Sequence, residues 1–269
     1  MSGGRDPAIR RHYESDGLAE RLLAEIDDPA RDIGPALDQF HVGGAKATRR
    51  LAKHLDLPSG ATVLDVGSGL GGPARLLAED RNWDVTGVDL SPDFARIATA
   101  LSVRLGWAGQ TRFCAGDALS LPFADARFDV IWTEHVAMNI GARDALYREL
   151  ARVTRPGGLL ALYDVVAGPN AAPLTYPVPW ARAAGQSHMV DADTLGKNVT
   201  AAGWTVEIWV DETEFARDWL NDARPPRVPA GPTLRHVMGD DFPAMIGNLR
   251  DNFADNRLGA VQAVFRKTA

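Results

Sequence analysis

The sequence predicts an α/β protein built on a parallel, doubly wound sheet, and two observations predict this class. Five short runs rich in β-branched and aromatic residues alternate with helical patterns over about 105 residues, as in sheets with helical crossovers. A glycine-rich turn, GSGLGG, follows the first run and leads into a helix. The alternation ends near Val166, and the segments beyond it follow another plan.

The five expected strands are ATVLDVG (61–67), DVTGVDL, TRFCAGD, FDVIWTEH and LLALYDVV. The helix after the first strand has Pro73 in its first turn, where the missing N–H is not needed. The next helix has Ser91 as its N-cap and Pro92 at its first position. A further helix, ARDALYRELARV, is expected to end at Pro156 and two glycines.

The flanking segments complete a single domain over residues 1–269. We expect a helical N-terminal lid over 1–58, a cofactor-binding core over 59–166, and cap insertions for the substrate at 167–190 and 212–256. The last two expected strands, TVEIWVDET and GAVQAVFRK, are not joined by a short helical crossover. One of them should therefore run antiparallel to the others.

Composition narrows the class of protein. The chain has 269 residues, of which 45% are hydrophobic and 24% charged, the balance of a soluble globular protein. A net charge of −6 argues against a nucleic-acid partner, and no apolar run predicts a signal peptide or a membrane partner. Cys114 is the only cysteine, so an internal disulfide and a cysteine-based metal site are excluded. We expect a cytoplasmic enzyme without a metal, as a monomer or small homo-oligomer.

The glycine turn raises the question of which nucleotide it binds. Gly67, Gly69 and Gly72 have the spacing G-x-G-x-x-G, and Asp89 follows at the distance expected of a dinucleotide site. Asp65 stands immediately before the turn, where a carboxylate would repel a pyrophosphate. A dinucleotide-dependent oxidoreductase is therefore the remoter alternative.

The acids at the strand ends fit another adenosine compound. In a parallel sheet, the ligand lies at the carboxyl ends of the strands. Asp89 would bind the ribose hydroxyls, and Asp117 with Ala118 would suit the adenine ring and its amine. Asp65 would bind the ammonium of an amino-acid tail. An adenosine with a zwitterionic tail and no phosphate is S-adenosylmethionine, which we expect as the cofactor.

Four segments, VLDVGSGLGG, VTGVDLS, GDALSLPFADARFDVIW and RVTRPGGLLALYDV, resemble the class I S-adenosylmethionine-dependent methyltransferases. The resemblance implies a seven-stranded sheet of order 3-2-1-4-5-7-6 with strand seven antiparallel. It implies that Gly67, Ser68 and Gly69 pass the methionine moiety and that Leu90 packs on adenine. Gln39 and Glu134 complete the candidate cofactor-binding set.

The segments DQFHVGG, EHVAMNI, YPVPWA and VQAVFRK are similar to the sarcosine/dimethylglycine-type N-methyltransferases. This resemblance implies N-methylation of a small amine or amino acid. Glu134 departs from the glutamine that such relatives often carry, which leaves the substrate open. The alternatives are C- or O-methylation of a secondary metabolite and, more remotely, a non-enzymatic adenosine-binding module, because caps vary freely on one fold.

The candidate catalytic residues are His41, His135 and Tyr13. Methyl transfer needs positioning more than a nucleophile, but an ammonium acceptor must first lose a proton. A histidine base would give a rate that rises with pH through the ordinary histidine range. The position of Tyr13 in the first helix favours a residue of a helix core, and we keep it as a candidate contact over the methyl group.

The candidate substrate-binding residues are Tyr176, Trp180, Met138 and Asn139. The rings of Tyr176 and Trp180 would face a methylated ammonium by cation–π contact. Trp180 is equally read as a plug between insertion and sheet. A small-molecule acceptor is the expected partner.

Overall fold

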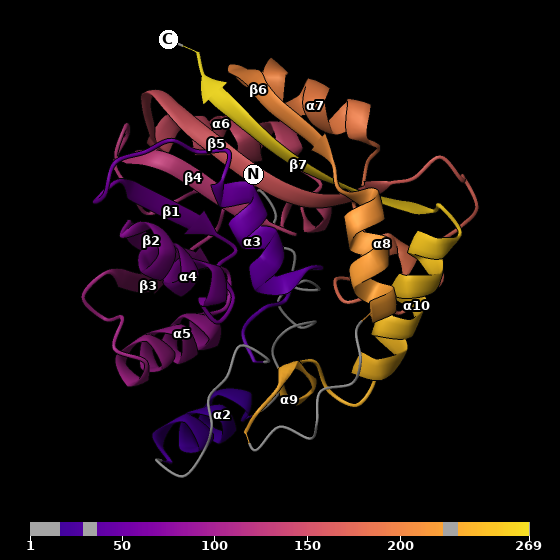
Figure 1. The fold of residues 1–269 in the computed structure, drawn as a ribbon, viewed down its shortest axis with the longest axis horizontal. Coiled ribbons are helices and arrows are strands. Elements are labelled where there is room, and N and C mark those ends of the chain that lie inside the picture. The colour runs from indigo at the N-terminus through magenta and orange to yellow at the C-terminus, as the bar shows by residue number, and fades with distance from the viewer. Residues whose placement is uncertain (1–16, 29–36, 223–230, 269) are drawn as a thin grey trace, which may run out of the picture.

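A seven-stranded sheet forms the centre of the computed structural model, which describes residues 17–28, 37–222 and 231–268 (Figure 1). The strand order is β3-β2-β1-β4-β5-β7-β6. The strands are β1 (Thr62–Val66), β2 (Asp84–Asp89), β3 (Thr111–Ala115), β4 (Phe128–Glu134), β5 (Thr154–Ala167), β6 (Trp204–Asp211) and β7 (Leu258–Lys267). β7 is antiparallel to β5 and β6, and the other pairs are parallel. The predicted fold class and strand order are confirmed.

Helices cover both faces of the sheet. They are α2 (Leu18–Asp27), α3 (Gly44–Ala52), α4 (Gly72–Arg81), α5 (Pro92–Arg104), α6 (Arg143–Val153), α7 (Ala192–Ala201), α8 (Thr213–Asp222), α9 (Leu234–Met238) and α10 (Phe242–Ala254), with short 3-10 turns η1 (Ala137–Asn139) and η2 (Ala184–Gln186). One hydrophobic cluster joins α3, α4, α8 and α10 to the sheet, and a second joins α6 and α7 to its other face. In Figure 1, α8 and α10 extend beyond the sheet at one end, beside α9.

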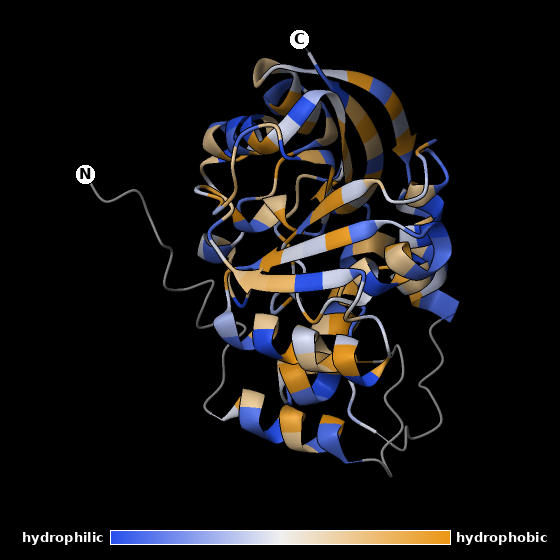
Figure 2. Ribbon diagram, turned by 90° about the vertical axis from the view of Figure 1, so that its left-hand side faces the viewer, coloured by the Kyte–Doolittle hydropathy of each residue, from blue (hydrophilic) through white to orange (hydrophobic). Residues whose placement is uncertain are grey.

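The central strands are buried along almost their whole length, as expected of a sheet covered on both faces. In Figure 2, hydrophobic residues recur along the strands between more polar ones, and the helices also mix hydrophobic and hydrophilic residues. Trp132 in β4 is 0% exposed and belongs to the core. The parallel register pairs Val66 with both Val88 and Thr133. The carboxyl ends of β1, β2 and β4 therefore lie side by side.

Local sequence signals set several element ends. The Ser91 hydroxyl accepts a hydrogen bond from the backbone of Phe94 at 3.3 Å and caps α5, as predicted. The prediction for the start of β5 was wrong, because this strand begins at Thr154 rather than after the glycines. Thr154 pairs with Phe128, and the pairing resumes at Leu159 after an irregularity. The start of β5 is therefore set by the pairing of Thr154 and not by Pro156.

Candidate active site

The turn between β1 and α4 presents backbone to the strand ends. Gly67, Gly69 and Gly71 have φ angles of 73°, 52° and 80°, a left-handed region that favours glycine. A Cβ on Gly67 would lie 2.5 Å from Cγ2 of Val136. The turn can therefore be this tight only because it lacks side chains, which leaves its backbone open to a ligand.

A cavity of about 460 Å³ lies at the carboxyl ends of these strands. Most of the predicted site residues line it: Gln39, His41, Asp65, Gly67, Ser68, Gly69, Asp89, Leu90, Asp117, Ala118, Glu134, His135, Met138, Asn139 and Trp180. Tyr176 is not among the lining residues and packs instead against the hydrophobic cluster beside α8 and α10. Tyr13 lies outside the described residues.

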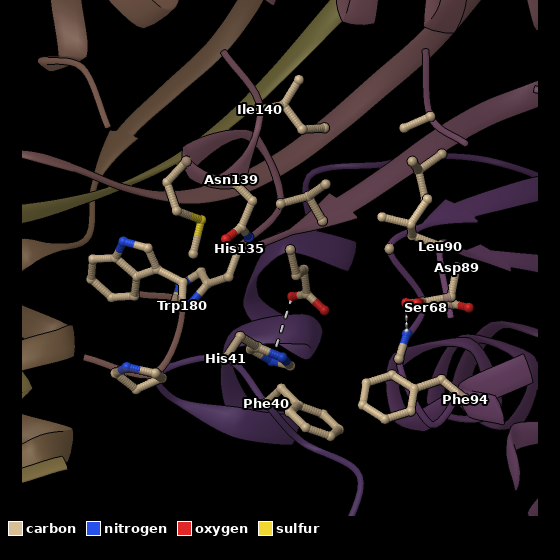
Figure 3. A pocket seen from close by; sticks show the side chains of 18 of the residues that line it. Phe40, His41, Ser68, Asp89, Leu90, Phe94, His135, Asn139, Ile140 and Trp180 are labelled. Atoms are coloured by element: carbon tan, nitrogen blue, oxygen red, sulfur yellow. Dashed lines mark hydrogen bonds and ion pairs between the residues drawn. The ribbon is translucent and has the colours of Figure 1, made fainter. Parts of the chain in front are cut away.

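One end of the cavity has the features expected of an adenosine site. Asp89, at the end of β2, accepts hydrogen bonds from the backbone N–H of Gly69 and of Ser91, both at 2.9 Å. Figure 3 shows Asp89, Leu90 and Phe94 together at this end. Phe94, which sequence reasoning missed, adds an aromatic wall.

Asp117 and Ala118 lie on the loop after β3 and also line the cavity. The Asp117 carboxylate accepts a hydrogen bond from the backbone of Leu119 at 2.9 Å, which holds the loop in a turn. Both residues therefore line the same cavity as Asp89, and their contact with adenine stays a prediction.

Three buried oxygens beside the turn lack a hydrogen-bond partner within the described part of the chain: Asp65 Oδ2, Ser68 Oγ and Gln39 Oε1. Burial raises the pKa of Asp65 well above its ordinary value, and the nearby carboxyls of Glu134 and Asp89 raise it further. Buried polar atoms in folded proteins are normally paired. A ligand with an ammonium and further polar groups would satisfy these atoms.

The segment around Asp38 closes over the turn. A Cβ on Gly72 would lie 2.3 Å from the Asp38 carbonyl oxygen, so the two backbones touch. The Asp38 carboxylate accepts a 2.6 Å hydrogen bond from buried Arg75 of α4, which also donates to the Leu70 carbonyl at 2.7 Å. Arg75 thus ties the predicted lid segment to the turn and its helix.

His41, Thr48 and Glu134 form a buried cluster on the cavity floor. Nε2 of His41 lies 2.9 Å from the Gly44 carbonyl oxygen, which can only accept, so Nε2 carries the proton and Nδ1 the lone pair. The Thr48 hydroxyl donates to Glu134 Oε2 at 2.9 Å. Glu134 Oε1 lies 3.6 Å from Nε2 of His41, the contact dashed at His41 in Figure 3.

Burial keeps both ring and acid of this cluster uncharged in the free protein. It lowers the pKa of His41 to about 4 and raises the pKa of Glu134 to about 8. The predicted pH response in the ordinary histidine range is therefore not expected of free His41, because this ring is already neutral there.

His135 follows β4 in a strained conformation, with φ of 57°. Its ring lies 4.8 Å from the Tyr163 ring and 6.0 Å from that of His41. Burial lowers its pKa well below the ordinary value. Nε2 of His135 and Oδ1 of nearby Asn139 are buried, and neither has a partner among the described residues. Both are therefore available to a ligand.

The opposite end of the cavity is apolar. Figure 3 shows Trp180 there, with His41 and His135 between it and the Asp89 end. The indole N–H of Trp180 donates to Ser187 at 3.0 Å, and the ring belongs to the core and also lines the cavity. Its contact with an ammonium stays a prediction. Trp219, Ile246 and Leu249 of the cap helices line the cavity and belong to the hydrophobic cluster that contains Trp180. Leu234, Met238 and Phe242 also line the cavity, and α9, which carries Leu234 and Met238, packs through Val237 in the same cluster as Phe94. None of the described lining residues is Lys or Arg.

Comparisons with known proteins agree with this geometry. Residues 64–162 match the methyltransferase domain family. The chain is 30% identical over 225 residues to the 27-O-demethylrifamycin SV methyltransferase of Amycolatopsis mediterranei, an alignment that covers 82% of this chain and 83% of that protein. The chain belongs to the S-adenosylmethionine-dependent methyltransferases.

Other relatives of this methyltransferase match in part or at lower identity. Methyltransferase GfsG of Streptomyces halstedii is 37% identical over 131 residues. This alignment covers 49% of this chain and only 47% of that protein. The crystal structure of a candidate sarcosine dimethylglycine methyltransferase from Galdieria sulphuraria superposes with a TM-score of 0.63 at 16% identity, over 83% of this chain and 86% of that one. This likeness supports the fold.

S-adenosylmethionine is thus the cofactor of the methyltransferase, and two structural neighbours were solved with it or with S-adenosylhomocysteine bound. The residues present fit it: unpartnered Asp65 and Ser68 oxygens would hold its amino-acid tail, and Asp89 its ribose. Within the described residues, no cluster of three His, Cys, Asp or Glu side chains could hold a metal ion. In the same part of the chain, no helix has the length and hydropathy to cross a membrane.

Sequence reasoning missed Thr48, Arg75 and the cap residues Trp219 and Phe242. Thr48 lies on α3, which carries no recognised motif, and Arg75 follows the last glycine of the motif on α4. The roles of both depend on contacts with distant segments. The aromatic residues of the cap were visible in the region assigned to substrate, but its pattern did not show which side faces inward.

Proposed function

We propose that this methyltransferase methylates a hydroxyl oxygen of an uncharged, mainly apolar small molecule. The observation that carries the proposal is the pair of neutral imidazoles, His41 and His135, between the cofactor end and an apolar acceptor chamber. S-adenosylmethionine supplies an electrophilic methyl group when it is bound. The chain's own residues must then orient the hydroxyl and take its proton.

His41 is suited to accept that proton. Its lone pair is on Nδ1, and its pKa of about 4 keeps the ring neutral at neutral pH, so that this lone pair is free to accept a proton. His135 Nε2 and Asn139 Oδ1 are the buried polar atoms that can hold the acceptor hydroxyl in line. As the O–C bond forms, the O–H bonding pair stays on oxygen and the proton passes to Nδ1 of His41.

The apolar chamber favours the neutral acceptor. A small amino acid such as sarcosine carries a carboxylate, and a buried carboxylate needs a cationic or hydrogen-bonding partner. The described lining has no Lys or Arg to provide one. The similarity to a relative named for an O-demethylated compound, 27-O-demethylrifamycin SV, supports the same choice. N-methylation of a sarcosine-type amine stays the alternative, because Trp180 can also face an ammonium.

An acceptor panel tests the proposal. The panel contains hydroxylated polyketides, terpenoid alcohols and phenols on one side, and sarcosine, dimethylglycine and simple amines on the other. Release of S-adenosylhomocysteine identifies acceptors, and carbon-13 NMR with methyl-labelled cofactor identifies the methylated atom. We expect an O-methyl resonance from a neutral acceptor. Turnover of the amines alone would replace this proposal by N-methylation.

A further inference from the structure

Glu134 is a carboxyl buried without a cationic partner. Its side chain is 3% exposed and accepts a hydrogen bond from Thr48 at 2.9 Å. His41 lies 3.6 Å away and is neutral in the free protein. Among the described residues, no Lys or Arg forms an ion pair with Glu134. Such a site is costly for a carboxylate but accepts the neutral acid.

The groups around Glu134 provide no compensating charge. The Asp65 carboxyl on β1 and the Tyr163 hydroxyl on β5 are close enough to interact electrostatically with it. Both are acidic groups, and His135, next in the chain, is held neutral by burial. Buried Arg75 is paired with Asp38. Glu134 therefore lines the cavity as an acid without a positively charged partner among the described residues.

We propose that Glu134 is the counter-ion of the cofactor's sulfonium and thereby makes the site distinguish S-adenosylmethionine from S-adenosylhomocysteine. The two compounds share the adenosine, the ammonium and the carboxylate, and differ in the charge on sulfur. A nearby positive charge favours the ionised carboxyl. The sulfonium form therefore expels the Glu134 proton to solvent, whereas the neutral thioether leaves the acid protonated. This proposal rests on the proposed methyl transfer, but not on the identity of the acceptor.

Ionised Glu134 also completes the charge balance of the reaction. Before transfer, the sulfonium and the Glu134 carboxylate sum to zero, and His41 and the hydroxyl are neutral. The O–C bond forms as the S–C bond breaks, and the hydroxyl proton moves to Nδ1 of His41. The positive charge then resides on His41, still 3.6 Å from the Glu134 carboxylate. The net charge of the buried site stays constant, which avoids an uncompensated charge at any stage.

Proton release on binding, measured without an acceptor, tests the assignment. Calorimetry in buffers of different ionisation enthalpy counts the protons released. The pKa of Glu134 is about 8. An opposite charge lowers a carboxyl pKa by about 1–3 units, so at pH 7 we expect about 0.4–0.9 more protons released by S-adenosylmethionine than by S-adenosylhomocysteine. Asp65 responds to the ammonium that both compounds carry, so protons released from Asp65 cancel when the two compounds are compared.

The same linkage predicts a change in preference with pH. The affinity ratio of S-adenosylmethionine to S-adenosylhomocysteine should rise roughly five- to fifty-fold from pH 6 to pH 8. The sign follows because protons compete with the sulfonium at low pH, and this competition ends once Glu134 is ionised. Glu134→Gln keeps the shape and the acceptor for Thr48, and should lose this dependence and the difference in proton release.

Asp164→Asn is the matched control. Asp164 is a buried carboxyl on β5 with a pKa of about 7, accepts from the Val136 backbone at 3.0 Å, and does not line the cavity. This variant should keep the wild-type difference in proton release between S-adenosylmethionine and S-adenosylhomocysteine. Equal proton release for both compounds in the wild type, or a difference that persists in Glu134→Gln, would overturn the proposal. Should Glu134→Gln not fold, the wild-type infrared spectrum decides: a protonated-carboxyl band must disappear with S-adenosylmethionine and persist with S-adenosylhomocysteine.

The two proposals fail separately. Failure of the Glu134 assignment leaves cofactor binding and the acceptor panel unaffected. Failure of hydroxyl methylation, shown by turnover of amines alone, leaves the difference in proton release intact.

Discussion

Arg75 of α4 and Asp38 of the segment over the glycine turn form a 2.6 Å ion pair whose side chains are only 5% and 11% exposed. Arg75 also donates to Ser102 at 3.2 Å and to the carbonyl oxygen of Ala98 at 3.3 Å, both on α5. One side chain therefore joins the lid segment, the turn and two helices. Because both charges are buried, removal of either side chain would leave the other charge without a counter-ion.

Asp38→Asn should lower the free energy of unfolding by about 3–5 kcal/mol, because it leaves the Arg75 guanidinium buried without a counter-ion. Urea denaturation measures this change. The control is Asp84→Asn, which removes the exposed partner of Arg112 and should cost under about 1 kcal/mol. Adding Arg75→Met to Asp38→Asn should recover part of the loss. Equal losses of stability in Asp38→Asn and Asp84→Asn would show that the buried ion pair stabilises the protein no more than the exposed one.

The glycine turn offers a second test through Gly67→Ala. Its positive φ disfavours alanine by about 1–2 kcal/mol, and the new Cβ would lie 2.5 Å from Val136, the residue after strained His135. We expect a loss of stability beyond the φ cost and at least about ten-fold weaker cofactor binding, since displacement of Val136 disturbs the cavity wall. Calorimetry with S-adenosylhomocysteine measures the affinity.

Gly60→Ala separates backbone strain from the clash. Gly60 has φ of 79°, and a Cβ there would meet nothing within 4 Å. This variant should show only the φ cost and unchanged cofactor affinity. If Gly67→Ala behaved as Gly60→Ala does, close approach of the backbones at the turn would not matter for binding.

Local signals predicted the alternation of strands and helices and the candidate cofactor residues, whereas the strand order came from the family resemblance. The glycines, Asp65, Asp89 and Asp117 each follow or end a predicted strand, so their spacing alone brings them to one edge of a parallel sheet. The Thr48–Glu134 and Asp38–Arg75 contacts join residues 86 and 37 positions apart. No local pattern encodes such pairs, because packing of α3 and of the lid segment decides them.

The acceptor end was predicted least well for a related reason. Tyr176 and Trp180 stand in one proline-rich segment, yet only Trp180 lines the cavity. An irregular segment has no fixed periodicity, so the sequence does not show which rings face inward. The shifted pKa values of His41 and Glu134 depend in the same way on burial by distant segments.

His41 can be tested as the proposed base with His41→Ala. Loss of a general base reduces rates by about 10²–10⁴, so kcat with the acceptor identified by the panel should fall by this factor. Affinity for S-adenosylhomocysteine should change little, and added imidazole should restore part of the rate. His54→Ala is the control, because His54 at the end of α3 does not line the cavity. Reduced turnover without rescue by imidazole would indicate a structural role.

Trp219 on α8 tests whether the cap helices bind the acceptor. It lines the cavity and packs against the hydrophobic cluster that contains Trp180. Trp219→Ala should raise KM for a bulky neutral acceptor by about ten-fold or more, since loss of a buried aromatic contact costs a few kcal/mol at most. The cofactor dissociation constant should stay within two-fold of wild type. Trp209→Ala, which removes a tryptophan that is 39% exposed on β6 and outside the cavity, should change neither constant. An unchanged acceptor KM in Trp219→Ala, or a parallel loss of cofactor affinity, would mean that this wall does not select the acceptor.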